Sequence, residues 1–362
     1  MTVPLLDVVI AVHTRTRPIG RAVASLLGDE PVDVRVTVVC HGIEAVRIAE
    51  TVGIPAGPLL RYVEYRDGIP SPAGPFNHGM RMADGAYVAI MGSDDFVEPG
   101  ATKAWTEYLR AHRPDIALMR LRRQDGTILA SPLTRIGRSR SLDAVRDRLF
   151  YRTAPLALIR RELLVDPALS LTEGLRTGDD MALSARLWAG SARVDLLSDA
   201  PCYVIGADAG DRITESVMTV GDQLRAVELL VSSDWWRRLP GATRASLGVK
   251  LLRVHVLDAL LGRPTADAWT DQGRRDIVRI VEAVVRDAPR ALRPLSRADR
   301  ALLDAARHAG SAEELVQAIH RRRTAGRWET MLPRAWWRAF DRESTLVRFL
   351  LYRLRRGGTE RG

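Results

Sequence analysis

The sequence predicts an α/β fold, in which a parallel sheet with helices on both faces is followed by an all-α C-terminal region. Between residues 6 and 91, apolar runs of strand length alternate with segments of helical period, which is typical of strands buried in a parallel sheet. From about residue 220 helical periodicity dominates. We expect an α/β domain over 1–217, a helical domain over 218–330, and a basic amphipathic helix and tail over 331–362.

The first half of the chain alternates strands and helices. Pro18 favours a helix start, because proline fits the first helical turn. In a sheet built this way, ligands bind beyond the carboxyl ends of the strands. In chain order the expected elements are strand Leu6–Val12, helix 18–27, strand Val32–Cys40, helix Glu44–Thr51, strand Leu60–Tyr65, helix Asn77–Ala83 and strand Ala86–Met91.

The second half contains helical segments separated by glycine and proline, which interrupt helices. The expected helices are Asp222–Trp236, Ala242–Leu261, Asp267–Val285, Arg297–His308, Ala312–Arg322 and Arg334–Arg356.

Charge and motif content narrow the classes of function. The net charge is +10, but residues 316–362 hold twelve arginines against four acidic residues, so most of the excess lies beside tryptophans at one end. We therefore expect no nucleic-acid partner, although a strongly basic chain suggests one. The GxGxxG fingerprint and the GxxxxGK[ST] loop are missing, which argues against a dehydrogenase or a P-loop kinase.

The N-terminal residues show no sign of a secretory signal, because they lack a basic start and a small-residue cleavage site. No apolar run approaches the roughly 18–20 residues that a spanning helix needs. We expect a cytoplasmic protein, with peripheral binding at the inner face of the cell membrane as one option.

The segment 334–356 supplies that option. Leu346, Val347, Leu350, Leu351 and Leu354 share one helical face, and Arg348, Tyr352, Arg355 and Arg356 share the other. One interpretation is a helix on an anionic membrane surface, with its apolar face inward. The other is a helix that packs on its own domain or on a second subunit of a homo-oligomer.

Paired acids follow the strand Ala86–Met91, in the loop Gly92-Ser93-Asp94-Asp95. Adjacent carboxylates repel one another unless a cation is present, and their oxygens suit Mg²⁺ or Mn²⁺. The alternative is that Asp94 or Asp95 caps the helix that starts near Pro99.

Four motifs occur in a fixed order. They are the strand and turn Val8–Thr14 leading through Arg17 into a helix, the segment Asn77-His78-Gly79, the loop Gly92–Asp95, and Gly178-Asp179-Asp180 at the start of the helix Met181–Trp188. Over roughly residues 5–215 this order resembles the inverting GT-A glycosyltransferases of family 2.

The resemblance implies a GT-A (Rossmann-like) fold and transfer of a sugar from a nucleotide-diphosphate sugar to an acceptor hydroxyl. It also implies a divalent metal, Mn²⁺ or Mg²⁺, with Asp94 as principal ligand and Asp95 as its helper. Asp180 would be the general base that takes the proton of the acceptor hydroxyl, and Asp179 its orienting neighbour. The alternative for this pair is an acid-rich helix N-terminus.

The resemblance further implies donor contacts, at His13, Thr14, Arg17, His41, Asn77, Ser93, Asp94 and Arg212. Two positions depart from the family pattern. The second strand ends in Cys40-His41-Gly42, where the family carries an acid for the nucleobase, and Gly92 stands where it carries another acid. We expect His13 or His41 to contact the base instead.

Two of these assignments have open alternatives. Asn77, the only asparagine in the chain, either bonds the metal loop or donor or caps a helix. Arg212 either meets the diphosphate or is a surface arginine.

The expected partners are a UDP-sugar donor and a glycan, polyol-phosphate or lipid-linked acceptor in bacterial cell-envelope synthesis. Guanosine and thymidine sugars stay open. The competing hypothesis is a catalytically degenerate GT-A protein that keeps the fold for binding or assembly, which the departures at Gly92 and Cys40-His41 favour.

Overall fold

The computed structural model describes residues 3–28, 33–190, 192–208 and 218–359. The chain forms two compact units. The first comprises Met1–Asp143, Arg152–Gly174 and Ala182–Glu215, and the second comprises Ala144–Tyr151, Leu175–Met181 and Ser216–Gly362. The expected domain boundary at residue 217 lies outside the described residues.

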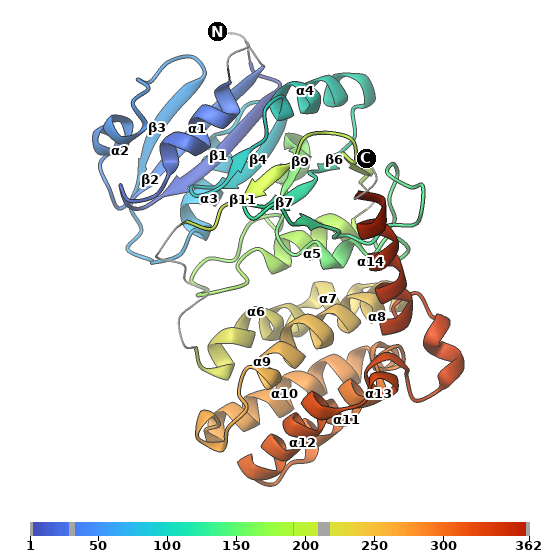
Figure 1. Cartoon of the computed structure of the whole chain (residues 1–362). Coiled ribbons are helices and arrows are strands. Elements are labelled where there is room, and N and C mark those ends of the chain that lie inside the picture. Colours follow the sequence, from blue (N-terminus) through green and yellow to red (C-terminus); the bar gives the residue numbers. More distant parts are fainter. Residues whose placement is uncertain (1–2, 29–32, 191, 209–217, 360–362) are drawn as a thin grey trace. The chain divides into compact units, whose positions relative to one another are not determined.

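The first unit is built on a mixed sheet that has seven strands within the described residues, in the order β10-β6-β9-β4-β1-β2-β3 (Figure 1). Its pairs are parallel except those of β9, which runs antiparallel to both β4 and β6. The strands predicted within residues 6–91 pair in parallel as expected, and the antiparallel β9 was not among them. The strands are β1 (Leu6–Val12), β2 (Val34–His41), β3 (Leu60–Tyr65), β4 (Tyr87–Gly92), β6 (Ile116–Leu118), β9 (Ala157–Arg160) and β10 (Val194–Leu196).

A small second sheet has the order β5-β11-β7-β8. Its strands are β5 (Phe96–Val97), β7 (Leu121–Arg123), β8 (Ile128–Leu129) and β11 (Tyr203–Ile205). The helices along the first unit are α1 (Ile19–Leu27), α2 (Ala45–Val52), α3 (Ala73–Met82), α4 (Ala101–His112), the 3₁₀ turn η2 (Arg161–Val165) and α5 (Met181–Ala189).

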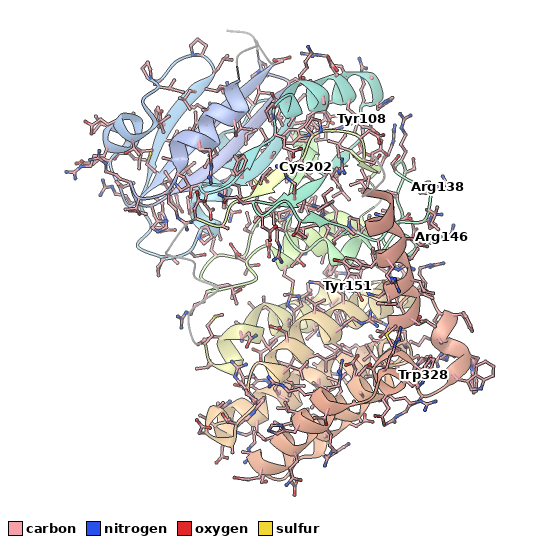
Figure 2. The ribbon with its side chains drawn as sticks, viewed as in Figure 1. Tyr108, Arg138, Arg146, Tyr151, Cys202 and Trp328 are labelled. Atoms are coloured by element: carbon pink, nitrogen blue, oxygen red, sulfur yellow. The ribbon has the colours of Figure 1, made fainter. Side chains whose placement is uncertain are left out.

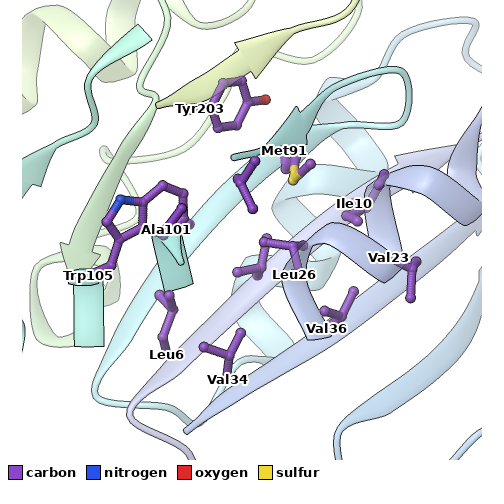
Figure 3. Close-up of a cluster of buried hydrophobic side chains, with 14 of the residues drawn as sticks. Leu6, Ile10, Val23, Leu26, Val34, Val36, Met91, Ala101, Trp105 and Tyr203 are labelled. Carbon is purple, nitrogen blue, oxygen red and sulfur yellow. The ribbon is translucent and has the colours of Figure 1, made fainter. Parts of the chain in front are cut away.

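Helices cover both faces of the large sheet, as expected. On one face, Leu6 and Ile10 of β1 pack in a buried cluster with Val23 and Leu26 of α1 (Figure 3). On the other face α3 lies so close that a Cβ on Gly79 would overlap Val9. Successive side chains of a strand point to opposite faces of the sheet, so the side chains of β1 contribute to the hydrophobic cores on both faces.

The parallel register brings several strand ends to one edge. Ala11 of β1 pairs with Gly92 of β4, and Val12 pairs with Cys40 of β2. The residues that follow these strands therefore emerge side by side, which is where an α/β sheet binds its ligands.

The second unit is helical (Figure 1). The helix Arg297–His308 has the predicted bounds, whereas the predicted Asp222–Trp236 is two helices separated at Ser233, whose hydroxyl accepts the Trp236 N–H. The elements are η1 (Leu149–Tyr151), α6 (Val220–Ser232), α7 (Asp234–Arg238), α8 (Gly241–Lys250), the π-helical turn η4 (Leu251–Val256), α9 (Leu257–Leu261), η5 (Ala266–Ala268), α10 (Asp271–Asp287), η6 (Pro289–Leu292), α11 (Arg297–His308), α12 (Ala312–Thr324), α13 (Arg327–Met331), η7 (Trp336–Phe340) and α14 (Thr345–Thr359).

None of the helices in the described part of the chain combines the length and the apolar character that crossing a membrane requires.

Candidate active site

Asp95 connects the loop after β4 to the end of β11. Its Oδ2 accepts a hydrogen bond of 2.5 Å from the Tyr203 hydroxyl, and its Oδ1 accepts one of 2.8 Å from the Gly206 N–H. Burial raises the pKa of Asp95, and these two hydrogen bonds partly offset the effect. Both carboxylate oxygens are engaged inside the protein, so Asp95 braces the loop.

Asp94 lies beside two arginines of the loop and helix that follow β1. Its Oδ2 is 3.3 Å from Nη1 of Arg17, and its backbone carbonyl accepts a hydrogen bond of 2.6 Å from Nη2 of Arg21. The side chains of Asp94 and Arg17 are mostly buried, at 16% and 14% exposure. Neighbouring Ser93 is buried. The edge of the sheet thus holds a carboxylate and two guanidinium groups, and guanidinium suits phosphate oxygens.

Gly92 is required by the position of Asp95. A Cβ on Gly92 would lie 2.5 Å from Oδ2 of Asp95, closer than real contacts allow. An acid at this position would collide with the carboxylate that Tyr203 binds. The departure from the family pattern therefore goes together with the brace formed by Asp95.

A second contact ties the segment after β11 to α1. Arg21 donates hydrogen bonds of 2.7 and 2.9 Å to the two carboxylate oxygens of Asp208, and this lowers the pKa of Asp208. A Cβ on Gly206 would overlap the carbonyl oxygen of Asp94, so the two segments approach as closely as glycine permits. Arg21, Gly206 and Asp208 were not predicted from the sequence. Arg212 lies outside the described residues.

At the ends of β2 and β3, His41 bonds Asp67, an acid that was not predicted from the sequence. Nε2 of His41 is 2.7 Å from Oδ1 of Asp67, which also accepts the Ile69 N–H at 2.9 Å. Burial alone would raise the pKa of Asp67, but the Ile69 and His41 bonds outweigh it and the pKa is lowered. The rings of Tyr65 and His78 lie 4.9 Å apart beside this pair. Asp67 could have been found as the acid that follows the next strand along the same edge.

His13 and Thr14 leave the end of β1 at this edge too. His13 is exposed, and the Thr14 hydroxyl accepts the Thr16 N–H at 3.4 Å. Their place in the parallel register puts them next to the loop that carries Asp94.

The structure decides two of the alternatives that involve helix caps. The helix after the loop Gly92–Asp95 is α4, whose N-cap residue is Gly100, so neither Asp94 nor Asp95 caps it. Asn77 is the fifth residue of α3 and not its cap. Its amide donates to the Leu171 carbonyl at 3.0 Å and to Glu173 at 2.9 Å, and accepts the Leu171 N–H at 2.9 Å. These bonds hold the segment 171–173.

The second unit carries Asp179 and Asp180. Gly178, at a φ of 75°, lies against α6, since a Cβ there would be 2.8 Å from Cβ of Ala226. Burial raises the pKa of Asp179. Burial and the charge of Asp179 raise the pKa of Asp180 to about 7, while Lys250 opposes the rise. A carboxyl with a pKa near 7 is suited to general-base work at neutral pH.

The side chains of the loop Gly92–Asp95 determine whether it can bind a metal ion. No group of three or more His, Cys, Asp or Glu side chains suited to a metal occurs in residues 3–28, 33–190, 192–208 and 218–359. Asp94 offers one carboxylate, because Asp95 is engaged by Tyr203 and Gly206. Mg²⁺ and similar ions can be held by one or two carboxylates together with phosphate oxygens and water. The residues fit a cation that a bound diphosphate helps to hold.

Residues 7–166 match the family model described as glycosyl transferase family 2. This segment, which is 160 of the 362 residues, is similar to a family 2 glycosyltransferase domain. Because the match begins at β1 and extends past the loop Gly92–Asp95, it includes the edge at which Arg17, Arg21 and Asp94 meet.

Two curated relatives have related names. The poly(ribitol-phosphate) beta-N-acetylglucosaminyltransferase TarS of Staphylococcus aureus (strain Mu50) is 22% identical over 164 residues, which are 44% of this chain and 28% of TarS. The poly(ribitol-phosphate) beta-glucosyltransferase of Bacillus spizizenii is 18% identical over 218 residues, 60% of this chain and 34% of that protein. The matched regions thus span about a third or less of these relatives.

Solved structures show the same fold. The crystal structure of S. aureus TarS 1–349 in complex with UDP-GlcNAc superposes with a TM-score of 0.73 at 17% identity, and covers 88% of this chain and 91% of that one. The complex of the same fragment with UDP gives a TM-score of 0.69 at 16% identity, covering 89% and 92%. The expected GT-A fold followed by a helical region is confirmed.

Proposed function

We propose that this chain is an inverting glycosyltransferase that moves a sugar from a UDP-sugar to a hydroxyl of a polyol-phosphate polymer of the bacterial cell envelope. The observation that carries the proposal is the pairing of Asp94 with Arg17 beside Arg21, at the edge where the ends of β1 and β4 meet. The names of the relatives support the acceptor class, and the UDP-GlcNAc complex of TarS supports the donor class.

The donor would lie along this edge of the first unit. Arg17 and Arg21 would face the diphosphate, with Ser93 and Thr14 nearby and Arg212 as a further contact. At the ends of β2 and β3, the pair formed by His41 and Asp67 offers the hydrogen-bonding groups that a uracil ring needs, and exposed His13 stands at the end of β1. Asn77 would act by fixing the segment 171–173.

A divalent cation, Mn²⁺ or Mg²⁺, would be held by Asp94, with Asp95 behind it. When bound it would neutralise charge on the departing diphosphate. The chain's own contribution at this place is the guanidinium of Arg17, 3.3 Å from Asp94. It can move from the carboxylate to a phosphate oxygen when both are present, because it binds either anion.

Asp180 would be the general base. The acceptor oxygen attacks the anomeric carbon as the bond from that carbon to the diphosphate oxygen breaks, and the hydroxyl proton passes to the Asp180 carboxylate. One displacement inverts the configuration at the carbon. Asp179, adjacent and also raised in pKa, would orient the acceptor hydroxyl.

Each of the expected domains would have its own role in the reaction. Residues 1–217 would bind the donor, 218–330 would support the acceptor side, and 331–362 would hold the protein near its acceptor. Segment 175–181 belongs to the helical unit, which links the proposed base to that unit.

Donor hydrolysis and transfer test the proposal. With UDP-sugars, Mn²⁺ and a polyol-phosphate polymer, we expect sugar transfer that is lost in Asp94→Ala and in Asp180→Asn. Arg47→Ala, which alters an exposed ion pair with Glu44, is the matched control and should keep activity. Absence of both hydrolysis and transfer with uridine, guanosine and thymidine sugars would favour the degenerate binding protein instead.

Two arginines of the C-terminal helix α14, Arg348 and Arg355, face its own unit. The guanidinium of Arg348 lies 3.5 Å from the centre of the Tyr151 ring, and burial lowers the pKa of Arg355 while Asp147 opposes the shift. Phe349, Leu350 and Leu354 are exposed, at 36%, 49% and 64%. Arg348 therefore packs on its own unit, because the Tyr151 ring covers it.

Exposed aromatic side chains precede this helix. They are Trp328, which lies at the surface of the second unit (Figure 2), Trp336, Trp337 and Phe340. Tryptophan suits the membrane–water interface, and the excess of arginine over acid in 316–362 suits anionic headgroups. We propose that these side chains and the exposed face of α14 contact an anionic lipid surface, at the inner face of the cell membrane.

Vesicle binding tests this contact. We expect co-sedimentation with phosphatidylglycerol vesicles, weak binding to phosphatidylcholine vesicles, and a severalfold loss of binding in Leu350→Ser/Leu354→Ser. Leu229→Ser, at a residue with 39% exposure on α6, is the control and should bind normally. Equal binding by the double variant, or a stable homo-oligomer that the double variant dissociates, would overturn the lipid proposal.

A further inference from the structure

A π-helical turn interrupts a long helix of the second unit. Residues 241–261 run through α8, η4 and α9, and in η4 (Leu251–Val256) the backbone bonds skip back five residues. π-helical turns make up well under about 1% of residues in globular proteins and occur mostly at functional sites. We therefore looked for side chains whose positions depend on this turn.

The turn brings together two side chains five positions apart. Nζ of Lys250 lies 2.6 Å from Nε2 of His255. In a regular α-helix, residues five apart differ by roughly 140° around the axis and point to different sides. A π-helical turn has more residues per turn, so the i and i+5 side chains approach the same face. The Lys250–His255 contact depends on this geometry.

Lys250 is an unusual residue in an unusual place. It is one of two lysines among the 54 Lys and Arg residues, and its side chain is 2% exposed. Burial lowers the pKa of Lys250 to about 8, while Asp180 opposes the shift. Burial and the charge of Lys250 lower the pKa of His255 to about 3, so the ring is neutral. Nε2 of His255 therefore accepts a hydrogen bond from the ammonium of Lys250.

The charged groups that act on Asp180 are Asp179 and Lys250. The charged group that acts on Lys250 is Asp180, and the neutral ring of His255 is its hydrogen-bond partner. A buried pair of acids such as Asp179 and Asp180 takes up a proton readily, because each charge opposes the other. Lys250 is the cation that offsets this repulsion.

We propose that Lys250, held by His255 across the π-helical turn, is a positioning residue that keeps the Asp180 carboxylate ionised and ready to take the proton of the acceptor. The inference rests on the proposed role of Asp180 as general base. It assigns a task to the lysine, the histidine and the irregular turn together.

The pH dependence of kcat tests the proposal. In the wild-type protein kcat should rise with pH through about 7, where Asp180 ionises, and then level off. In Lys250→Met this rising limb should move up by about one pH unit. This shift would lower kcat about tenfold at pH 6.5, with recovery at pH 9 and an unchanged donor KM.

Two further variants separate charge from structure. Lys250→Arg keeps the cation and should hold the rising limb within about half a pH unit of wild type. His255→Gln keeps a hydrogen-bond acceptor and should behave similarly, whereas His255→Leu should move the limb upward. An unmoved limb in Lys250→Met, or an equal loss of kcat at every pH in a protein with normal thermal stability, would overturn the proposal.

A second measurement does not depend on catalysis. Carboxyl ¹³C spectra of aspartate-labelled protein, with Asp180→Asn used to assign the signal, give the titration of Asp180 directly. If the wild-type protein transfers no sugar but the Asp180 midpoint rises in Lys250→Met, the proposed function fails and the Lys250 assignment stands. If sugar is transferred and the midpoint does not move, the Lys250 assignment fails.

Discussion

Arg21 and Asp208, 187 positions apart, form a bidentate ion pair with hydrogen bonds of 2.7 and 2.9 Å. The same arginine donates to the backbone carbonyl of Asp94 and lies over the ring of Phe96, 4.5 Å from its centre. One side chain thus fixes α1, the loop Gly92–Asp95 and the segment after β11 at the proposed diphosphate site.

Removal of this ion pair should weaken donor binding. In Asp208→Asn and Arg21→Ala we expect the donor KM to rise severalfold, because the segment after β11 loses its hold beside Asp94. The effect in Arg21→Ala should be larger, since the bond to the Asp94 carbonyl is lost too. Steady-state kinetics and UDP titration calorimetry measure both. Donor KM values equal to wild type in both variants would contradict the assignment.

Substitutions should show that Asp94 acts in ligand binding and that Asp95 stabilises the fold. Asp94→Ala should remove Mn²⁺-dependent UDP binding and leave the thermal midpoint within about a degree or two, because the side chain lies at the edge of the fold. Tyr203→Phe should lower the midpoint by several degrees, since Asp95 would keep a buried oxygen without its donor. Titrations with UDP, with and without Mn²⁺, and thermal melts distinguish the two. A large loss of thermal stability in Asp94→Ala together with a loss of UDP binding but no loss of stability in Tyr203→Phe would contradict these roles.

Replacement of Gly92 by the acid of the family pattern should not restore an ordinary site. We expect Gly92→Asp to destabilise the fold, because its Cβ would lie 2.5 Å from Oδ2 of Asp95. The double variant Gly92→Asp/Asp95→Ala should be less destabilised than the sum of the single changes, since the obstructing carboxylate is gone. Urea unfolding of the four proteins completes the cycle, and strict additivity would rule out the collision.

Asp180→Asn should change the pH dependence of stability as well as abolish transfer. Burial and Asp179 raise the Asp180 pKa from 3.8 to about 7 in the folded protein. A raised pKa gives stability that is fully present below about 4 and is lost as the pH rises to about 7. Relative to wild type, Asp180→Asn should therefore become more stable as the pH rises from 4 to 8. Thermal melts across this range test it, and parallel curves would refute it.

The order of strands and helices could be predicted because strands buried on both faces, such as Leu6–Val12, read as continuous apolar runs. The direction of β9 could not, because a four-residue apolar strand does not encode its partners. Asp94 could be proposed from the sequence because it follows a buried strand. Asp208 could not, since its partner Arg21 is far away in sequence and only the folded sheet brings them together.

The same limit applies to α14. The helical periodicity of its sequence predicts one apolar face and one basic face. It does not predict which of the two faces packs against the rest of the protein. A cation–π contact of Arg348 with Tyr151 reverses the arrangement that hydrophobicity alone suggests. Asn77 stands out in the sequence as the only asparagine, but its bonds to Leu171 and Glu173 could be found only from the fold.

The membership of segment 175–181 in the helical unit has a practical consequence for dissection of this protein. A fragment that ends at residue 217 would still contain Asp180 in its covalent chain. It would lack α6, which Gly178 packs against, and Lys250, whose charge acts on Asp180. An acid–base titration of such a fragment would measure the Asp180 carboxyl without the groups that set its pKa in the whole chain. Inactivity of the fragment would therefore not test the role of Asp180.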